Sequence, residues 1–449
     1  KSINPATNLI LQEYETFSDD KVISIINLLS QEYLDWRNTT FEFRKNILIS
    51  IADILEEEVE KHSKMITLEI GKPISESRAE VLKCAWVIKY FAENSEKFLK
   101  NEHIKTDYKE SYIQYDPLGV ILGIMPWNFP YWQVFRFISP ALMAGNVCLL
   151  KHASNVSGCS LLIEDLILRA SNQKNIYRSI LINSSQVENV IKNSNIKAVS
   201  LTGSDKAGSD VAKIAGREIK KTVLELGGSD PFIVLEDADL DKASKTAISA
   251  RFFNAGQSCI AAKRFLVHEN VYDVFINKIS EHINNLVVGD PMDEETDIGP
   301  LAKKEFVDEI HNIVVSSINQ GAKCLIGGKI VEKTYYEPTL LIDVTDNMDV
   351  FKKETFGPVL CVSKIKNIEE AIRIANNSKY GLGGSLWTKD IDLAKKLTNQ
   401  LNTGAVFIND MTKSDPRLPF GGINKSGYGV ELSKFGLLEF VNIKTIVLN

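Results

Sequence analysis

Apolar positions in the first quarter of the chain recur at helical spacing. Between residues 20 and 105, apolar side chains return every three or four positions with acids and lysines between them, as at Ile47, Ile51 and Leu55. This spacing gathers the apolar side chains on one face of a helix. The pattern breaks at Gly71-Lys72-Pro73 and then resumes. The sequence therefore predicts a set of amphipathic helices with one boundary at this break.

Beyond Gly119 the pattern changes to short apolar runs that alternate with helical stretches. Runs of this length are typical of buried strands, and their alternation with helices is typical of parallel α/β sheets. A second alternating series follows residue 259, so we predict two α/β domains. The strands are expected at 147–150, 198–201, 223–226, 264–268 and 359–365, and the helices at 161–169, 207–220, 272–286 and 368–376.

Two further segments have the pattern of strands but lie outside these series. Residues 111–115 alternate between polar and apolar side chains, and residues 440–448 also have a strand-like pattern. We expect these segments to form β-structure outside the two α/β cores.

Composition and charge limit the possible partners. With 449 residues, of which 44% are hydrophobic and 24% charged, the chain has apolar material for about three domains of ordinary size. The formal net charge is -6, and no dense run of lysine and arginine occurs. A nucleic-acid partner is therefore not expected.

Cysteine spacing and the N-terminal residues bear on the compartment. The six cysteines are widely spaced, and none forms a Cys-x-x-Cys pair. No zinc-ligand spacing or disulfide framework is present, so we expect no metal site and a reducing compartment. The first residues have no basic and apolar signal pattern, and the apolar run 119–125 is far too short to span a bilayer. We expect a cytoplasmic protein with no membrane partner.

Cys259 and Glu225 are the main candidates for chemistry. Cys259 ends the segment Phe253-Asn254-Ala255-Gly256-Gln257-Ser258-Cys259, and Glu225 stands upstream in Thr222-Val223-Leu224-Glu225-Leu226-Gly227-Gly228. A soft nucleophile and a carboxylate beside glycines suggest covalent catalysis assisted by a general base. Taken alone, a cysteine among small residues is more often an inert buried thiol, and a glutamate at a strand end is more often solvated.

Two features after predicted strands suit a nucleotide. The turn Thr202-Gly203-Ser204 leads into a helix, whose N-terminal N–H groups favour a phosphate. Many such turns contain glycine and serine for steric reasons alone, and the spacing from Gly203 to Gly208 is not the G-x-G-x-x-G fingerprint. Lys151 follows the apolar run 147–150, at a strand end where nucleotides bind. A lone lysine there more often only extends its ammonium into water.

Several segments together resemble the motifs of one enzyme family. They include Pro126-Trp127-Asn128-Phe129-Pro130, Glu354-Thr355-Phe356-Gly357-Pro358 and Pro419-Phe420-Gly421-Gly422. With the Cys259 and Glu225 segments, they resemble the aldehyde dehydrogenase superfamily. The resemblance extends from residue 4 to residue 429.

The resemblance implies a fold with two parallel α/β domains and a small β oligomerisation arm. Residues 1–105 and 118–226 would form the cofactor-binding domain, and residues 227–407 the catalytic domain. Residues 106–117 and 431–449 would form the arm, while residues 408–430 would return to the active-site region. The expected assembly is a homodimer or homotetramer.

The resemblance also implies a mechanism. Cys259 would attack an aldehyde, the side-chain amide of Asn128 and the backbone N–H of Cys259 would hold the oxyanion, and hydride would pass to NAD or NADP. Glu225 would then activate the water that hydrolyses the thioester. The implied cofactor contacts are Trp127, Lys151, Ser154, Gly203, Ser204, Gly208, Leu226, Glu354 and Phe356.

Ser154 departs from the form common in the family. The segment reads Lys151-His152-Ala153-Ser154, whereas many members that prefer NAD carry a glutamate at the last position. Because serine brings neither negative charge nor bulk, the additional 2'-phosphate of NADP would meet no repulsion. NADP is therefore permitted, and the choice between NAD and NADP stays open.

The substrate-side residues resemble those of succinate semialdehyde dehydrogenases. That group has an arginine at the position of Arg136, where it holds the distal carboxylate of the substrate. The neighbours of Arg136 are mostly apolar, so a buried guanidinium there needs a partner. Trp132 and Arg417 are further expected substrate contacts. Other small polar aldehydes such as glyceraldehyde or lactaldehyde remain open, and a cofactor-free thiol hydrolase is the alternative from another class.

Overall fold

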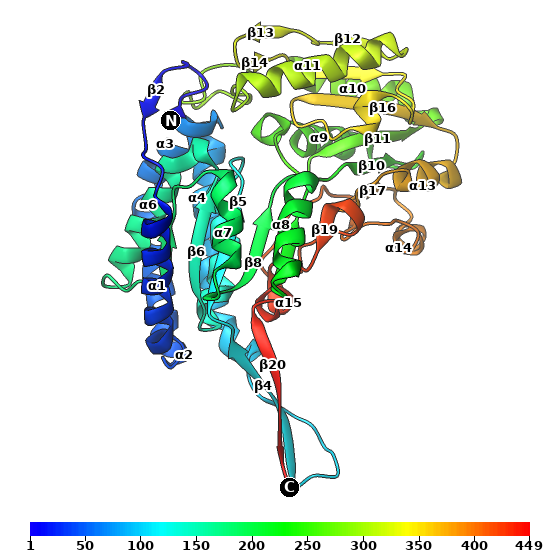
Figure 1. Ribbon diagram of the computed structural model, residues 1–449. Helices are drawn as coiled ribbons and strands as arrows, with labels where there is room; N and C mark the ends of the chain where they lie inside the picture. The colour runs from blue at the N-terminus through cyan, green and yellow to red at the C-terminus, as the bar shows by residue number, and fades with distance from the viewer.

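The computed structural model describes residues 1–449 and contains two parallel α/β units and a projecting β arm (Figure 1). Each unit has its own hydrophobic core. The chain passes from the first large sheet to the second through residues 226–229, between a strand ending at Glu225 and one beginning at Asp230. The predicted fold class is confirmed.

Four helices near the N-terminus cover the first sheet, after the short strands β1 (Ser2–Ile3) and β2 (Ile10–Gln12). Ser18 and Thr40 cap the first two helices through their side-chain oxygens. The predicted break is present, because Gly71 adopts a left-handed conformation with φ 78° and ends the third helix. The helices are α1 (Asp19–Trp36), α2 (Phe41–Glu57), α3 (Val59–Ile70) and α4 (Ile74–Phe98).

The first large sheet has six strands in the order β19-β9-β8-β5-β6-β7. All neighbours are parallel except β19, which pairs antiparallel with β9 at the edge. Its inner strands are apolar along their length because helices cover both faces. The strands are β5 (Val120–Met125), β6 (Val147–His152), β7 (Tyr177–Ser179), β8 (Ile196–Thr202), β9 (Lys221–Glu225) and β19 (Gly427–Tyr428), and the helices are α5 (Trp132–Met143), α6 (Ser157–Ala170), α7 (Val187–Lys192) and α8 (Asp205–Arg217).

The second large sheet has seven strands in the order β12-β15-β16-β11-β10-β17-β18, and only β12 is antiparallel to its neighbour. Its strands are β10 (Asp230–Val234), β11 (Ala262–His268), β12 (Lys323–Ile326), β15 (Thr339–Ile342), β16 (Val359–Ile365), β17 (Ser385–Trp387) and β18 (Phe407–Ile408). The helices of this unit are α9 (Leu240–Phe252), α10 (Tyr272–Asn284), α11 (Lys304–Asn319), α12 (Asp349–Lys352), α13 (Ile368–Asn376) and α14 (Ile391–Thr398). The hairpin β13 (Ile330–Glu332) and β14 (Tyr335–Tyr336) lies beside α11 in Figure 1.

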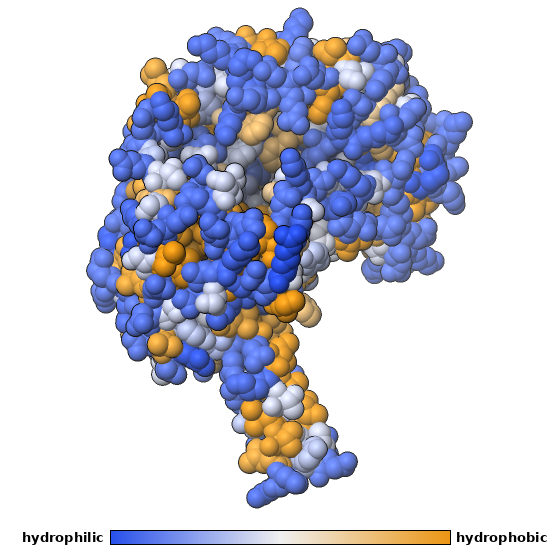
Figure 2. All heavy atoms as spheres, in the orientation of Figure 1, coloured by the Kyte–Doolittle hydropathy of each residue, from blue (hydrophilic) through white to orange (hydrophobic).

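The projecting arm is an antiparallel sheet in which β20 (Val441–Leu448) pairs along the whole of β4 (Glu110–Pro117). The strand β3 (Glu102–His103) adds to its other edge. The expected arm boundary at residue 431 is wrong by about one short helix. Residues 431–440 contain α15 (Ser433–Leu438), and several of their side chains pack into the first core. On the face that Figure 2 shows, apolar side chains gather along the middle of the arm, whereas its end is polar.

The remaining elements are short 3-10 helices: η1 (Ser154–Val156), η2 (Ser184–Gln186), η3 (Phe253–Gly256), η4 (Glu269–Val271) and η5 (Asn424–Ser426). None of the helices combines the length and the apolar composition needed to cross a bilayer.

Candidate active site

Cys259 lies in a loop whose backbone is strained. It follows η3, where Asn254 and Ala255 adopt left-handed conformations with φ 53° and 52°, and Gly256 has φ 74°. Left-handed backbone at non-glycine residues costs on the order of 1 kcal/mol each and persists only where surrounding contacts enforce it. Such strain is concentrated at functional sites.

Hydrogen bonds from the first unit enforce this conformation. The Asn254 side-chain amide donates to the backbone oxygen of Asn128 at 2.8 Å, and the Asn254 backbone N–H donates to Glu76 at 2.8 Å. Burial raises the pKa of Glu76 to about 8. The cysteine loop is therefore joined to the Asn128 loop and to α4.

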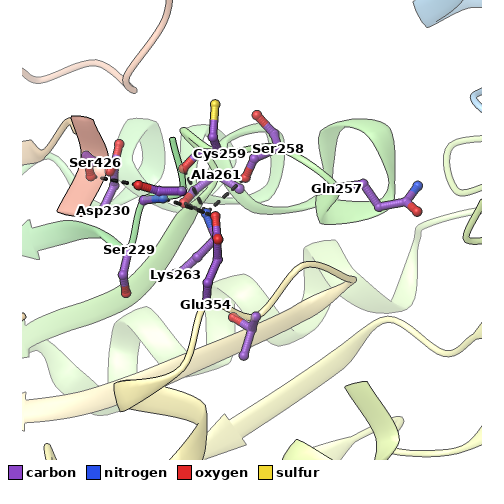
Figure 3. A network of polar contacts seen from close by, with 12 residues as sticks. Ser229, Asp230, Gln257, Ser258, Cys259, Ala261, Lys263, Glu354 and Ser426 are labelled. Carbon is purple, nitrogen blue, oxygen red and sulfur yellow. Dashed lines mark hydrogen bonds and ion pairs between the residues drawn. The ribbon is translucent and has the colours of Figure 1, made fainter. Parts of the chain in front are cut away.

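A buried lysine, Lys263, binds the backbone carbonyl groups next to the Cys259 thiol. Lys263 Nζ donates to the carbonyl oxygens of Ser258 at 2.9 Å and Cys259 at 2.8 Å, and lies 3.5 Å from Glu354 Oε1. Figure 3 shows the Cys259 sulfur pointing away from this network. The carbonyls are thus fixed on one side of the loop while the thiol faces the other.

Burial raises the pKa of the Cys259 thiol to about 11, and the nearby charges of Lys263 and Arg136 oppose this shift. The thiol is therefore protonated at neutral pH, and its reaction as a thiolate requires a base.

The thiol lines a cavity of about 210 Å³ between the two units. Aromatic side chains form much of its wall, and three cationic side chains also reach it. The lining includes Phe129, Trp132, Phe253, Cys259, Phe420, Lys83, Arg136 and Lys413. The cavity suits a small, partly apolar ligand whose charge is negative.

Asn128 lies beside the cysteine loop, as expected. Its side-chain Nδ2 donates to the carbonyl oxygen of Gln257 at 2.9 Å, and its Oδ1 accepts from Gln133 at 3.0 Å. The side chain is buried, and the hydrogen bond to Gln133 fixes which end of the amide faces the loop. The Asn128 amide N–H is therefore held at Gln257, two residues before Cys259 in the chain.

Glu225 ends β9 and is 2% exposed. Neither carboxylate oxygen has a hydrogen-bond partner. Burial raises its pKa well above the ordinary value, the charge of Glu431 raises it further, and the charge of Arg136 lowers it. An unpaired buried carboxylate costs stability, so its retention is typical of a group that must accept a proton.

Arg136 lines the cavity and also has a carboxylate partner within the chain, and its role as the anchor of the substrate carboxylate stays a prediction. Its guanidinium forms a buried ion pair with Glu431, donates to Thr202 Oγ1 at 3.3 Å and lies over the Phe420 ring. The buried cation required a carboxylate, and this carboxylate belongs to the chain itself. Arg136 lines the cavity, pairs with Glu431, and its charge also lowers the pKa of Glu225.

Arg417 does not reach the cavity. Its side chain is 67% exposed and forms an ion pair with Asp415 at 2.6 Å. Because the short Asp-Pro-Arg turn satisfies the guanidinium locally, Arg417 is not retained as a substrate contact. Trp132, in contrast, is buried and lines the cavity.

The residues expected on the nicotinamide side of the cofactor lie together. The Trp127 ring stacks on Phe306 at 5.0 Å and meets the edge of Phe356 at 5.8 Å. Glu354 Oε1 accepts from the backbone N–H of Gly228 at 3.1 Å. A Cβ on Gly227 would lie 2.3 Å from Glu354 Oε2, so only glycine permits this close approach.

The residues expected to contact the cofactor phosphates lie at the start of α8. Ser204 caps α8 by accepting from the Ala207 N–H at 3.2 Å. Gly203 lies just before this cap, and Gly208 is packed so closely on Leu226 that a Cβ would lie 2.6 Å from its methyl groups. The glycine at 208 therefore has a packing role in addition to any cofactor contact.

Lys151 and Ser154 follow the carboxyl end of β6. Burial lowers the pKa of Lys151, no nearby charge contributes to this shift, and Ser154 is exposed. His152, between them, is buried and lies 2.9 Å from the Pro130 backbone oxygen through Nε2. The histidine thus ties β6 to the Asn128 loop, a role that the sequence alone did not suggest.

Glu80 is a second residue that sequence reasoning missed. Its Oε2 forms a buried ion pair with Lys72, and its Oε1 accepts from the backbone N–H groups of Tyr131 at 2.9 Å and Trp132 at 3.0 Å. These N–H groups belong to the N-cap residue and the first residue of α5, directly after the Asn128 loop. A run of charges on a helix gives no sign of this contact, because most such residues face water.

The thiol, the amide donor and the unpaired carboxylate have complementary functions. A thiol can add to a carbonyl carbon, a fixed N–H can stabilise the resulting oxyanion, and a carboxylate can activate the water that releases the product. The site therefore defines an enzyme that acts on a carbonyl group through a covalent thiol adduct.

Comparisons with known proteins identify the family. A model of the aldehyde dehydrogenase family matches residues 1–446, and the chain belongs to this family. It is 47% identical over 447 residues to a probable succinate-semialdehyde dehydrogenase [NADP(+)] of Synechocystis sp., covering 99% of this chain and 98% of the relative. A Mycobacterium bovis succinate-semialdehyde dehydrogenase [NADP(+)] 1 is 46% identical over 450 residues, with the same coverage.

Solved structures agree with this assignment. The succinic semialdehyde dehydrogenase of Streptococcus pyogenes in complex with NADP+ superposes with a TM-score of 0.97 at 36% identity, covering 100% of this chain and 99% of that one. A betaine aldehyde dehydrogenase of Staphylococcus aureus in complex with NAD+ has a TM-score of 0.95 at 30% identity, with 100% and 93% covered. The protein is therefore an aldehyde dehydrogenase that uses a nicotinamide cofactor.

Proposed function

We propose that this enzyme oxidises succinate semialdehyde to succinate with NADP as the preferred cofactor. The observation that carries the substrate assignment is the cationic and aromatic cavity beside Cys259, which suits a short aldehyde with a distal carboxylate. The names of the relatives from Synechocystis and Mycobacterium support the same substrate. Glyceraldehyde and lactaldehyde carry no charge and would leave Lys83, which forms no ion pair within the chain, without a partner.

The residues of the chain divide the reaction into two steps. Cys259 adds to the aldehyde carbon after losing its proton, and the Asn128 amide and the Cys259 N–H hold the oxyanion. Each fixed donor is worth roughly 3 to 4 kcal/mol in such sites. When bound, the nicotinamide supplies the hydride acceptor. Glu225 then takes a proton from water as the water attacks the thioester, and succinate leaves as the thiol is restored.

The cofactor would lie along the carboxyl edge of the first sheet, where the residues present fit it. Lys151 offers an ammonium without a carboxylate partner, and the capped N-terminus of α8 at Ser204 offers N–H groups to a phosphate. Glu354, held against Gly227, and the Trp127 and Phe356 rings fit the nicotinamide riboside. Such a set of residues has no use in a cofactor-free thiol hydrolase.

The proposed preference for NADP rests on Lys151 and Ser154. The two residues present a positive charge and a small exposed hydroxyl, with no carboxylate between them. A 2'-phosphate would gain from the ammonium and meet no repulsion. We assign residues 1–105 and 118–226 to the cofactor-binding domain and residues 227–407 to the catalytic domain, with residues 408–430 returning to the site.

The arm is the proposed oligomerisation surface. The arm extends away from both cores, and several of its large apolar side chains are exposed. They include Ile104, Tyr108, Ile443, Val447 and Leu448. Exposed apolar strands of this kind are normally covered by another chain, so we propose a homodimer or homotetramer.

A steady-state panel tests the proposal. Formation of reduced nicotinamide is followed with succinate semialdehyde, butanal, glyceraldehyde and lactaldehyde, each with NAD and with NADP. The highest kcat/KM should belong to succinate semialdehyde with NADP. A higher value for any uncharged aldehyde would overturn the substrate assignment, and a higher value with NAD would overturn the cofactor assignment.

A further inference from the structure

Lys263 is a buried cation whose hydrogen bonds all go to backbone carbonyls. It lies at the start of β11 and is fully buried. Its ammonium donates to the carbonyl oxygens of Ser258 at 2.9 Å, Cys259 at 2.8 Å and Ala261 at 3.4 Å. A neutral amine has only two N–H donors, so three such bonds require the charged form. No step of the proposed reaction uses this charge.

Two carboxylates compensate the charge of Lys263 without taking its hydrogen bonds. Glu354 Oε1 lies 3.5 Å from Nζ but accepts from the Gly228 N–H at 3.1 Å. Asp230 is also buried and accepts from the Gly383 N–H at 3.0 Å. Burial lowers the pKa of Lys263, and the charges of Glu354 and Asp230 oppose this shift. The ammonium therefore stays available to the three carbonyls.

The bond to Ser258 acts on the peptide unit that carries the Cys259 N–H. The Ser258 carbonyl and the Cys259 N–H belong to one planar trans peptide, in which they point in opposite directions. Lys263 occupies the carbonyl side, and the Cys259 sulfur points away from it (Figure 3). The Cys259 N–H donates to no other group of the chain. It is therefore free for an oxyanion on the side opposite Lys263.

A cation bound to the carbonyl of a peptide strengthens the N–H at its other end. Connected hydrogen bonds polarise one another by roughly 10 to 30% per bond, and bonds from charged donors are about twice as strong as neutral ones. Lys263 also restrains the loop, because it binds the carbonyls on both sides of the Cys259 backbone. A donor that is fixed in advance needs no reorganisation when charge develops in the transition state.

We propose that Lys263 is a positioning residue of the oxyanion hole, which orients and polarises the peptide between Ser258 and Cys259. This inference rests on the proposed function, because it requires an oxyanion formed by attack of the Cys259 thiolate. Lys263 does not line the cavity, so it acts through this peptide and not on the aldehyde.

Loss of Lys263 would also affect the thiol itself. Burial raises the pKa of Cys259, and the charges of Lys263 and Arg136 oppose this shift, whereas those of Glu354 and Asp230 add to it. Without the lysine, less thiolate would form at a given pH. A test of the oxyanion hole must therefore separate the fraction of thiolate from the stabilisation of the oxyanion.

Two reactions of the same thiol make this separation. Acylation by an aldehyde and alkylation by iodoacetamide both use the Cys259 thiolate, but only acylation forms an oxyanion, since alkylation displaces iodide. With enzyme in excess over aldehyde, NADPH formation reports acylation without thioester hydrolysis. Alkylation in the presence of NADP is followed on the Cys259 peptide by mass spectrometry, because Cys324 is also exposed. At one pH, the ratio of the two rates cancels the thiolate fraction.

In Lys263→Met, the ratio of acylation to alkylation should fall roughly 3- to 30-fold with succinate semialdehyde and with butanal. A fixed oxyanion donor contributes about 100- to 1000-fold to the rate, and weakening it by 10 to 30% removes roughly 2- to 8-fold. The freer peptide removes the rest. Lys263→Gln keeps N–H donors without the charge, so its ratio should lie between those of the wild type and Lys263→Met. It also serves as the test if Lys263→Met does not fold.

Lys220→Met is the matched control. The half-buried Lys220 also donates to two backbone carbonyls, those of Ile191 and Asn193, but it lies outside the cavity. Its removal takes away the same kind of bond without touching the peptide at Cys259. The ratio should stay within about twofold of the wild type.

The outcomes separate this inference from the proposed function. A ratio within about twofold of the wild type in the Lys263 variants, or an equal fall in Lys220→Met, overturns the role of Lys263. Equal slowing of both reactions leaves the ratio unchanged and means that the lysine acts on the thiol alone. If Cys259→Ala still forms NADPH from the aldehyde, the covalent mechanism is wrong. A wild type that prefers butanal overturns the substrate assignment only.

Discussion

Glu80→Gln should lower both the stability and the turnover of the enzyme. The substitution removes the negative charge of the Glu80 carboxylate. This carboxylate compensates the charge of buried Lys72 and accepts hydrogen bonds from the backbone N–H groups of Tyr131 and Trp132. Removal of one partner of a buried ion pair costs roughly 3 to 5 kcal/mol. The start of α5 would also move, and Asn128 lies three residues before Tyr131. A displacement of about 1 Å at such a site can cost about 100-fold in rate.

Glu69→Gln is the matched control. Glu69 accepts from the backbone N–H groups of Gly158 at 2.8 Å and Cys159 at 2.9 Å, so it caps α6 as Glu80 caps α5, but away from the thiol. Its loss should cost about 1.5 to 3 kcal/mol of stability. At saturating cofactor, kcat should stay within about twofold of the wild type.

Urea unfolding and saturating kcat distinguish the two variants. We expect both to unfold at lower urea, with kcat reduced roughly 10- to 100-fold only in Glu80→Gln. Lys72→Met/Glu80→Gln should recover part of the stability, because it removes the unpaired buried ammonium. Equal losses of kcat in Glu69→Gln and Glu80→Gln, or an unchanged kcat in the latter, would refute the positioning role of Glu80.

Three further predictions concern the cofactor, the pH dependence and the arm. Ser154→Glu should lower kcat/KM with NADP relative to NAD about tenfold or more, since about 1.4 kcal/mol of repulsion suffices; an unchanged ratio would place residue 154 away from the ribose. The kcat/KM ratio of succinate semialdehyde to butanal should fall as pH rises through about 8, because Lys83, which faces Glu80, Asp415, Cys84 and Arg136, loses its proton. The ionisation of Cys259 and Glu225 affects both aldehydes and cancels, so a flat ratio would contradict this. Val447→Asp should reduce the oligomer mass in light scattering, and an unchanged mass would exclude that face of the arm.

Much of the fold was accessible from the sequence because it depends on local periodicity. The break at Gly71-Lys72-Pro73 separates α3 from α4 as predicted, and the buried strands occur where short apolar runs occur. Such patterns report which face of an element is buried. They do not report which distant element covers it, so no pattern corrects the arm boundary at residue 431 that the family resemblance implies, although residues 431–440 pack into the first core.

The chemistry was only partly accessible for the same reason. Apolar neighbours indicated that Arg136 needs a partner, but Glu431 lies far away in the sequence and no spacing rule connects them. Lys83 and Lys89 occupy the same helix and look alike in the sequence. Only the packing of α4 against the Ser414 loop shows that one faces the cavity and the other faces solvent.

The central claim is that oxidation proceeds through a thioester on Cys259 that Glu225 helps to hydrolyse. The most direct test is rapid mixing of Glu225→Gln with succinate semialdehyde and NADP, followed by quenching and peptide mass spectrometry. The account predicts a burst of reduced nicotinamide of about one equivalent per active site and a succinyl group on the Cys259 peptide, with slow turnover afterwards. A full steady-state rate, or a burst without any acyl group on Cys259, would contradict it.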